Sequence, residues 1–272
     1  MPEGQYVAVV SPEDIEWERV GLIEALYDGM TTRYLDALGI KAGWRCMDVG
    51  AGRGSIARWL AERVGPLGQV VAADLNPRLL RRASLPTNVE VREHNILTQA
   101  LEAAQYDLVH CRALLMHLPQ PAVALERMAA AVRPGGWLCL GEPDFTPFGA
   151  VDTQKPGALA FNQTFHACFD ALRAAGSVDS AFGRRLLGLV ERLGFANIGA
   201  AGEVLLGKGG SHPLGRFWSL SLRVPGIVAL VERGVVARET FAHMCACLDD
   251  PAFGFVGSIL FSVWGQRPSS GG

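Results

Sequence analysis

The sequence has little net charge and no long apolar run, and each absence argues against a class of protein. Lys and Arg number 25 and Asp and Glu 27, so the formal net charge is −2, whereas a nucleic-acid binder usually carries a basic excess. The most apolar late run, residues 253–265, is well short of the roughly 20 residues that span a bilayer. From the net charge and the short apolar run we expect no nucleic-acid partner and no membrane partner. No basic segment opens the chain, so we also expect no secretory signal.

The six cysteines form no Cys-x-x-Cys pair. A structural zinc site needs four convergent ligands, and the compact His/Cys group at residues 243–247 is too small to supply them. We therefore expect no metal. Cys46, Cys111 and Cys139 lie in apolar runs typical of strands, so we expect them to be small core residues. Free cysteines of this kind are typical of a reducing compartment, and we expect a cytoplasmic protein.

What the sequence does have is a large apolar content and a regular rhythm. Hydrophobic residues are 49% of 272, enough to bury a large core. Residues 40–142 alternate short apolar runs with helical patterns, which is typical of βαβ units and a parallel sheet. The expected strands are 45–49, 70–73, 89–91, 106–111, 137–140, 198–206 and 258–264, with helices or loops between them.

The most informative segment is Asp-Val-Gly-Ala-Gly-Arg-Gly-Ser at residues 48–55, which follows the first expected strand and opens a helix. Glycines permit a tight turn and close approach of a ligand, and a helix N-terminus offers unpaired N–H groups. Asp74 ends the second strand, where a carboxylate accepts both hydroxyls of a ribose. A dinucleotide site would need glycine where Ser55 stands, and the Gly-Lys-Ser/Thr of a triphosphate loop is missing.

With Asp74, Asn95, the segment 106–118 and the Arg-Pro-Gly-Gly of 133–136, this motif resembles the class I S-adenosylmethionine-dependent methyltransferases of small-molecule type. The resemblance covers residues 30–142 well and the rest by strand count. It implies an α/β fold with a Rossmann-like seven-stranded sheet, mostly parallel with the last strand antiparallel. We expect a cofactor-binding core with an N-terminal helical segment at 1–144. Residues 145–272 would supply the last two strands and helical lid insertions at about 145–180 and 210–250.

The resemblance also implies where S-adenosylmethionine binds. The glycine turn faces its methionine part, Asp74 its ribose and Leu75 its adenine, while His110 or Cys111 lies near the sulfonium. Asn95 stands where many relatives have Asp, and its amide oxygen can still accept from the adenine amine. Arg33 either pairs with the cofactor carboxylate or is a solvated helix residue. The expected cofactor-binding residues are Arg33, Asp48, Gly50, Ala51, Gly52, Gly54, Asp74, Leu75, Asn95, Ile96, His110 and Cys111.

Three residues are candidates for chemistry at the acceptor, each with a structural alternative. His117 follows the fourth strand and is either a general base or a residue that packs against the cofactor. Glu142 ends the fifth strand and either binds substrate or caps a loop. His166 lies among the phenylalanines of the inserted helix and is either catalytic or packs in the lid.

The leading hypothesis is an enzyme that transfers a methyl group from S-adenosylmethionine to O, N or C of a small hydrophobic molecule, in a biosynthetic or secondary-metabolite role. The absence of Asn/Asp-Pro-Pro-Tyr/Phe after the fourth strand argues against DNA bases as acceptors. One alternative is a protein of the same fold that binds the cofactor but catalyses a cyclisation or isomerisation; another is a nicotinamide-dependent oxidoreductase. The oligomeric state stays open, with a homodimer among the options.

Overall fold

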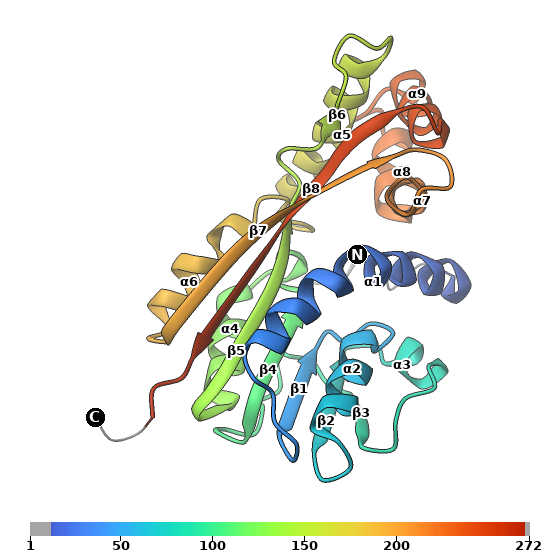
Figure 1. Ribbon diagram of the computed structural model, residues 1–272. Helices are drawn as coiled ribbons and strands as arrows, with labels where there is room; N and C mark the ends of the chain where they lie inside the picture. The colour runs from blue at the N-terminus through green and yellow to red at the C-terminus, as the bar shows by residue number, and fades with distance from the viewer. Residues whose placement is uncertain (1–11, 270–272) are drawn as a thin grey trace.

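The predicted βαβ alternation builds the first half of the sheet (Figure 1). The computed structural model describes residues 12–269, so the opening segment that the sequence analysis tested for a secretory signal lies outside the described residues. Five strands pair in parallel in the order β3-β2-β1-β4-β5. They are β1 (Arg45–Val49), β2 (Gln69–Asp74), β3 (Val89–Glu93), β4 (Tyr106–Arg112) and β5 (Val132–Asp144).

The second half of the chain completes the sheet with antiparallel pairs. β8 (Gly254–Gln266) runs antiparallel to β5, and β7 (Ala196–Lys208) antiparallel to β8. The fold class is thus confirmed, with one correction to the strand number. The short β6 (Gly149–Ala150) also pairs with β8 and brings the described sheet to eight strands rather than seven.

The three strands β5, β7 and β8 each have 13 residues and are longer than the sequence predicts. Pairing along both edges of β8 satisfies the backbone N–H and C=O groups, so even glycine and polar residues with no strand pattern are held extended. In Figure 1 the far ends of β7 and β8 run beyond the parallel strands towards a group of late helices.

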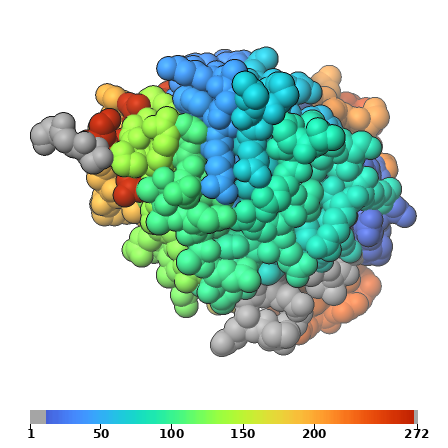
Figure 2. Space-filling model, turned by 90° about the horizontal axis from the view of Figure 1, so that it is seen from below, coloured from blue at the N-terminus to red at the C-terminus, as the bar shows by residue number. Residues whose placement is uncertain are grey.

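Helices cover both faces of the sheet and gather at one end of it. The described helices are α1 (Glu13–Ala37), α2 (Ser55–Val64), α3 (Arg78–Arg82), α4 (Pro121–Ala131), α5 (Ala158–Ala174), α6 (Leu186–Arg192), α7 (Pro213–Ser221), α8 (Pro225–Glu232) and α9 (Arg238–Asp249), with 3-10 turns η2 (Leu115–His117) and η3 (Gly183–Arg185). α1 lies between the parallel strands and α7 (Figure 1). Seen from the amino ends of these strands, the surface belongs mainly to the first half of the chain (Figure 2).

The apolar core has two parts, one on each face of the sheet. Successive residues of β1 alternate between them: Cys46 packs with α2, and Met47 packs in the larger cluster that reaches α4 and α5. This alternation is what a sheet covered on both faces requires. Cys111 and Cys139 are buried as well, so the expectation of core cysteines is confirmed.

The described helices are short or interrupted by polar residues when compared with a membrane-spanning helix. Within residues 12–269 no single helix is long and apolar enough to cross a bilayer. The pair α7 and α8 passes the test only when joined across a 59° bend, by length and composition alone.

The close packing of η3 against the end of β5 predicts a strong effect of one methyl group. A Cβ at Gly183 would lie 2.4 Å from the carbonyl oxygen of Glu142. Gly183→Ala should therefore destabilise the fold by about 1–3 kcal/mol, measured by denaturant unfolding. Gly29→Ala in α1 is the matched control, because a Cβ there meets nothing within 4 Å. It should stabilise the helix by about 0.5–1 kcal/mol; equal effects of both variants would contradict the prediction.

Candidate functional site

The turn between β1 and α2 is held by its glycines and by the end of β2. Gly50, Gly52 and Gly54 have φ of 71°, 60° and 83°, a left-handed conformation that glycine adopts without strain. The N–H of Gly50 donates to the carbonyl of Ala73 at 2.8 Å, and that of Gly52 to Oδ2 of Asp74 at 3.2 Å. The turn and the acidic end of β2 are therefore one connected unit.

A cavity of about 210 Å³ opens beside this unit, at the carboxyl ends of β1, β2 and β4. This is the edge where ligands bind in open α/β sheets, at the point where the strand order reverses. Of the residues expected to bind the cofactor or act in catalysis, the cavity wall includes Asp48, Gly50, Ala51, Gly52, Asp74, Leu75, Asn95, Ile96, His110 and His117.

Asp74 lies in the wall with both carboxylate oxygens near backbone donors. Besides the bond from Gly52, Oδ1 accepts the N–H of Asn76 at 3.0 Å. Burial raises the pKa of Asp74 above its usual range, against these hydrogen bonds, which lower it. Each carboxylate oxygen keeps further acceptor capacity, so the group can still receive hydroxyl donors.

The side chain of Asn95 has less hydrogen-bonding capacity left for a ligand than the sequence suggests. Its Oδ1 already accepts the N–H of Leu97 at 2.9 Å, and its own N–H donates to Gln99. One lone pair of the amide oxygen is thus used to shape the loop after β3, which leaves the second for a ligand amine.

His110 and Asp48 form a buried pair in the wall. Nδ1 of His110 lies 2.7 Å from Oδ1 of Asp48, and both side chains are buried. Because a carboxylate only accepts, Nδ1 of His110 donates in this pair. Within residues 12–269, Nε2 is buried and has no hydrogen-bond partner. The site therefore holds a ring nitrogen that can bond a polar atom of a ligand.

Three expected cofactor residues, Arg33, Gly54 and Cys111, do not line the cavity. Arg33 pairs with Glu203 at 3.0 Å, and 62% of its side chain is exposed. Gly54 caps α2, where a Cβ would meet Leu80 and not the cavity. Cys111 points into the core opposite to His110, because adjacent residues of a strand face opposite sides.

Glu142 also lies outside, and its carboxyl group holds the loop after β4. Oε1 accepts the N–H groups of Leu114 and Leu115 at 2.9 and 2.8 Å, and Oε2 accepts that of Met116 at 3.3 Å. Burial raises the carboxyl pKa to about 7, although these three donors lower it. In this position Glu142 caps a loop, which is one of the two alternatives that the sequence left open. It influences the site through the loop that ends in His117.

His117 stands where the first cavity meets a second one of about 100 Å³. The two share His117, Arg19, Ile23 and Ala113 in their walls. Burial, together with the positive charge of Arg19, lowers the pKa of His117 to about 3. The imidazole is therefore neutral at neutral pH and able to accept a hydrogen bond.

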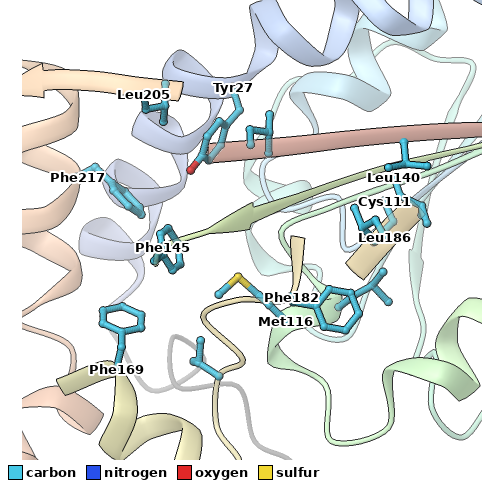
Figure 3. Packing of buried hydrophobic residues seen from close by; sticks show 14 of the residues in the cluster. Tyr27, Cys111, Met116, Leu140, Phe145, Phe169, Phe182, Leu186, Leu205 and Phe217 are labelled. Carbon is cyan, nitrogen blue, oxygen red and sulfur yellow. The ribbon is translucent and has the colours of Figure 1, made fainter. Parts of the chain in front are cut away.

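The second cavity is mainly apolar, and we call it the aromatic cavity after the aromatic side chains in its wall. Figure 3 shows Phe145, Phe169 and Phe217 around one space, with Tyr27 and Met116 beside it, and all five line the cavity. His166 does not line it: its Nε2 bonds the carbonyl oxygen of Phe148 at 3.1 Å, which is the lid-packing alternative. Of the phenylalanines spaced by four in α5, Phe169 alone reaches the cavity wall.

Sequence reasoning missed the contribution of α1 to the wall. Glu16 and Arg19 form a buried ion pair at 2.6 Å and line the first cavity. Arg112 ties the same helix to the sheet, since its Nη2 donates to Asp28 at 2.7 Å. An acid and a base three residues apart on a helix are usually a solvated pair. Both residues lie in the first two turns of α1, and a charged pair in that place does not by itself distinguish a cavity wall from a solvated surface.

The comparisons with known proteins agree with this geometry. The family described as a methyltransferase domain matches residues 23–198. The chain belongs to this methyltransferase family. The identification confirms the resemblance to class I S-adenosylmethionine-dependent methyltransferases and with it the expected cofactor. The chain is 30% identical to methyltransferase str3 of Strobilurus tenacellus over 196 residues, which cover 70% of this chain and 66% of the relative.

Two further likenesses extend the comparison. An ubiquinone biosynthesis O-methyltransferase of Paraburkholderia phytofirmans is 37% identical over 113 residues, 39% of this chain and 47% of the relative. The matched parts thus span no more than two thirds of these curated relatives. The fold resembles phosphoethanolamine N-methyltransferase 2 of Haemonchus contortus, with a TM-score of 0.53, 16% identity, and coverage of 89% of this chain and 53% of that one.

The methyltransferase cavity fits S-adenosylmethionine on its own chemistry. Nε2 of His110, which has no partner among residues 12–269, suits a polar group of the methionine part. The carboxylate of Asp74 suits two ribose hydroxyls, and the glycine turn permits backbone contact.

The raised pKa of Glu142 predicts a pH-dependent stability. Between pH 4.5 and 7 the folded state holds a proton that the unfolded state has lost, so stability falls as pH rises through this window. Glu142→Gln does not titrate and should lose this fall, on the order of 3 kcal/mol for a shift of this size. Unfolding free energies at pH 5 and pH 8 measure it. The exposed control Glu191→Gln should keep the wild-type slope; a wild-type slope in Glu142→Gln would contradict the assignment.

Proposed function

We propose that this protein transfers the methyl group of S-adenosylmethionine to a small, largely apolar acceptor held in the aromatic cavity. The observation that carries the proposal is the junction of the two cavities at His117. When bound, the cofactor supplies a methyl group already activated by its sulfonium, so much of the task of the chain is to position the two ligands and exclude water.

The cofactor cavity supports a division of binding roles. Asp74 would accept the ribose hydroxyls, with Leu75 beside the adenine and Asn95 and Ile96 at its edge. The glycine turn and Nε2 of His110 would hold the methionine part. These roles place the reactive end of the cofactor towards β4, which is the side where the cavity opens to His117.

His117 would act on the acceptor as a hydrogen-bond acceptor. The low pKa of His117 keeps its imidazole neutral, so the ring can accept a hydrogen bond from an O–H or N–H of the acceptor. This hydrogen bond would orient a lone pair of the acceptor atom towards the methyl group of the cofactor. The nearby positive charge of Arg19 makes a protonated imidazole unfavourable. We therefore assign His117 the role of orienting the acceptor by accepting a hydrogen bond from it.

Oxygen is the acceptor atom that the comparisons favour. Several relatives are named ubiquinone biosynthesis O-methyltransferases, and an O–H is a good donor to a neutral imidazole. A small hydroxylated organic molecule is accordingly the acceptor class we propose, in a biosynthetic role.

A labelled-methyl assay tests the proposal directly. The protein is incubated with methyl-labelled S-adenosylmethionine and a panel of hydroxylated aromatic compounds, and the products are weighed by mass spectrometry. A gain of one methyl group is expected. An isomeric product of unchanged mass would favour the cyclase or isomerase alternative, and tight cofactor binding with no transfer to any acceptor would count against the proposal.

Asp74→Asn should weaken cofactor binding. The amide keeps one acceptor oxygen but replaces the other by a donor, so one ribose hydroxyl loses its partner. The affinity for S-adenosylhomocysteine should fall about 10- to 100-fold, as for the loss of a hydrogen bond to a charged group. Calorimetric titration measures it. Asp36→Asn, in an exposed ion pair with Arg63, should bind like wild type; an unchanged affinity of Asp74→Asn would refute the ribose role.

His117→Gln should slow transfer without weakening cofactor binding. The amide oxygen can still accept a hydrogen bond, but it lies on a more flexible side chain and in a different position. The acceptor is then less well oriented, so kcat should fall about 10- to 100-fold. The affinity for S-adenosylhomocysteine should stay within about twofold. Steady-state rates with the best acceptor of the panel give kcat. A full rate in the variant would assign His117 to packing alone.

A further inference from the structure

The wall of the aromatic cavity includes two residues whose buried polar atoms have no hydrogen-bond partner among residues 12–269. Within the described residues, the indole Nε1 of Trp218 and Oγ of Ser221 are buried and have no hydrogen-bond partner, and both residues line the cavity. They lie three apart on α7, so they are neighbours on one face of the helix. Buried polar groups are normally paired, so these two neighbouring groups are the ones in this wall that a polar atom of a ligand can satisfy.

Local packing prevents the indole from finding a partner within the chain. The Trp218 ring makes edge contacts with Phe145, Phe148, Phe165 and Phe169, at centroid distances between 4.9 and 5.8 Å. The neighbouring hydroxyl of Ser219 is satisfied, because it donates to Asp249 at 2.8 Å. Among the described residues of α7, the buried side-chain atoms without a hydrogen-bond partner are therefore those of the two residues that line the cavity.

The chemistry of the two atoms defines the group that they would bind. An indole N–H only donates, and a serine hydroxyl donates or accepts, so together they suit an oxygen that accepts two hydrogen bonds. The wall on this side also includes Val224 and Ile227 and carries no charge. The cationic side chain in the wall, Arg19, is at the junction with the cofactor cavity and pairs with Glu16. A carboxylate here would be buried without a counter-ion, whereas a neutral carbonyl oxygen would be satisfied.

We infer that Trp218 and Ser221 anchor a neutral carbonyl oxygen of the acceptor, on the side of the molecule away from the atom that is methylated. The acceptor is then a flat aromatic or conjugated ketone, ester or quinone with a hydroxyl group directed at His117. The surrounding rings favour a planar body, since aromatic pairs stack or meet edge to face. This inference rests on the proposed function and specifies its substrate class.

A pair of probes that differ in one atom tests the anchor. In 6-acetyl-2-naphthol a carbonyl lies across the ring system from the hydroxyl, and in 6-isopropenyl-2-naphthol a CH₂ group replaces the carbonyl oxygen. Each probe is titrated, by fluorescence, into the protein saturated with S-adenosylhomocysteine and again into the protein alone. Wild type should bind the ketone about 10-fold more tightly than the alkene, as for hydrogen bonds to otherwise unpaired buried donors.

The variants separate the anchor from general packing. Trp218→Phe combined with Ser221→Ala removes both donors and keeps an aromatic ring, so the preference for the ketone should shrink to within about twofold. Ser221→Ala alone should lose part of it and serves if the double variant does not fold. Ser219→Ala on the same helix should keep the full preference. The ratio of two affinities in one variant is insensitive to a general loosening of the cavity.

The outcomes distinguish this inference from the proposed function. Equal binding of both probes to wild type, binding of neither, or a preference that survives in the double variant overturns the anchor. If methyl transfer is then still observed, the proposed function stands without it. A protein that binds no S-adenosylhomocysteine and transfers no methyl group refutes the proposed function. The titration without cofactor still decides in that case whether the two residues bind a carbonyl.

Discussion

One buried carboxyl group sets the geometry on which the site depends. Glu142 receives the backbone N–H groups of three successive residues, Leu114 to Met116, and so fixes the turn that ends in His117. Without this group the three donors would be buried and unpaired, which is costly. His117 thus lies between the two cavities because Glu142 pairs the backbone N–H groups of the turn before it. Glu142 itself lies outside both cavities.

The fold and the cofactor side of the site could be predicted because their signals are local in sequence. The strand, glycine turn and helix around residues 45–64 follow from periodicity and from the need for positive φ, and Asp74 follows from its place at a strand end. The length of β7 and β8 was not predictable, because it comes from pairing between distant segments rather than from an alternating pattern. The same holds for the short β6.

The acceptor side could not be predicted in detail because its walls come from segments far apart in the chain. Arg19 and Tyr27 on α1 meet Phe145 after β5 and Trp218 on α7 in one cavity. No local pattern marks such a meeting. Sequence reasoning therefore placed Glu142 among the catalytic candidates because it ends a strand, and His166 because it lies among the phenylalanines of an inserted helix. In the structure both side chains bond backbone groups of their own surroundings.

The two cavities draw on different stretches of the chain. The wall of the first is built from residues between 16 and 118, while the second adds residues between 143 and 227. Substitutions between residues 143 and 227 therefore change the second cavity and leave the wall of the first cavity untouched. A protein engineer who wishes to alter one cavity without the other has a defined region in which to place a library.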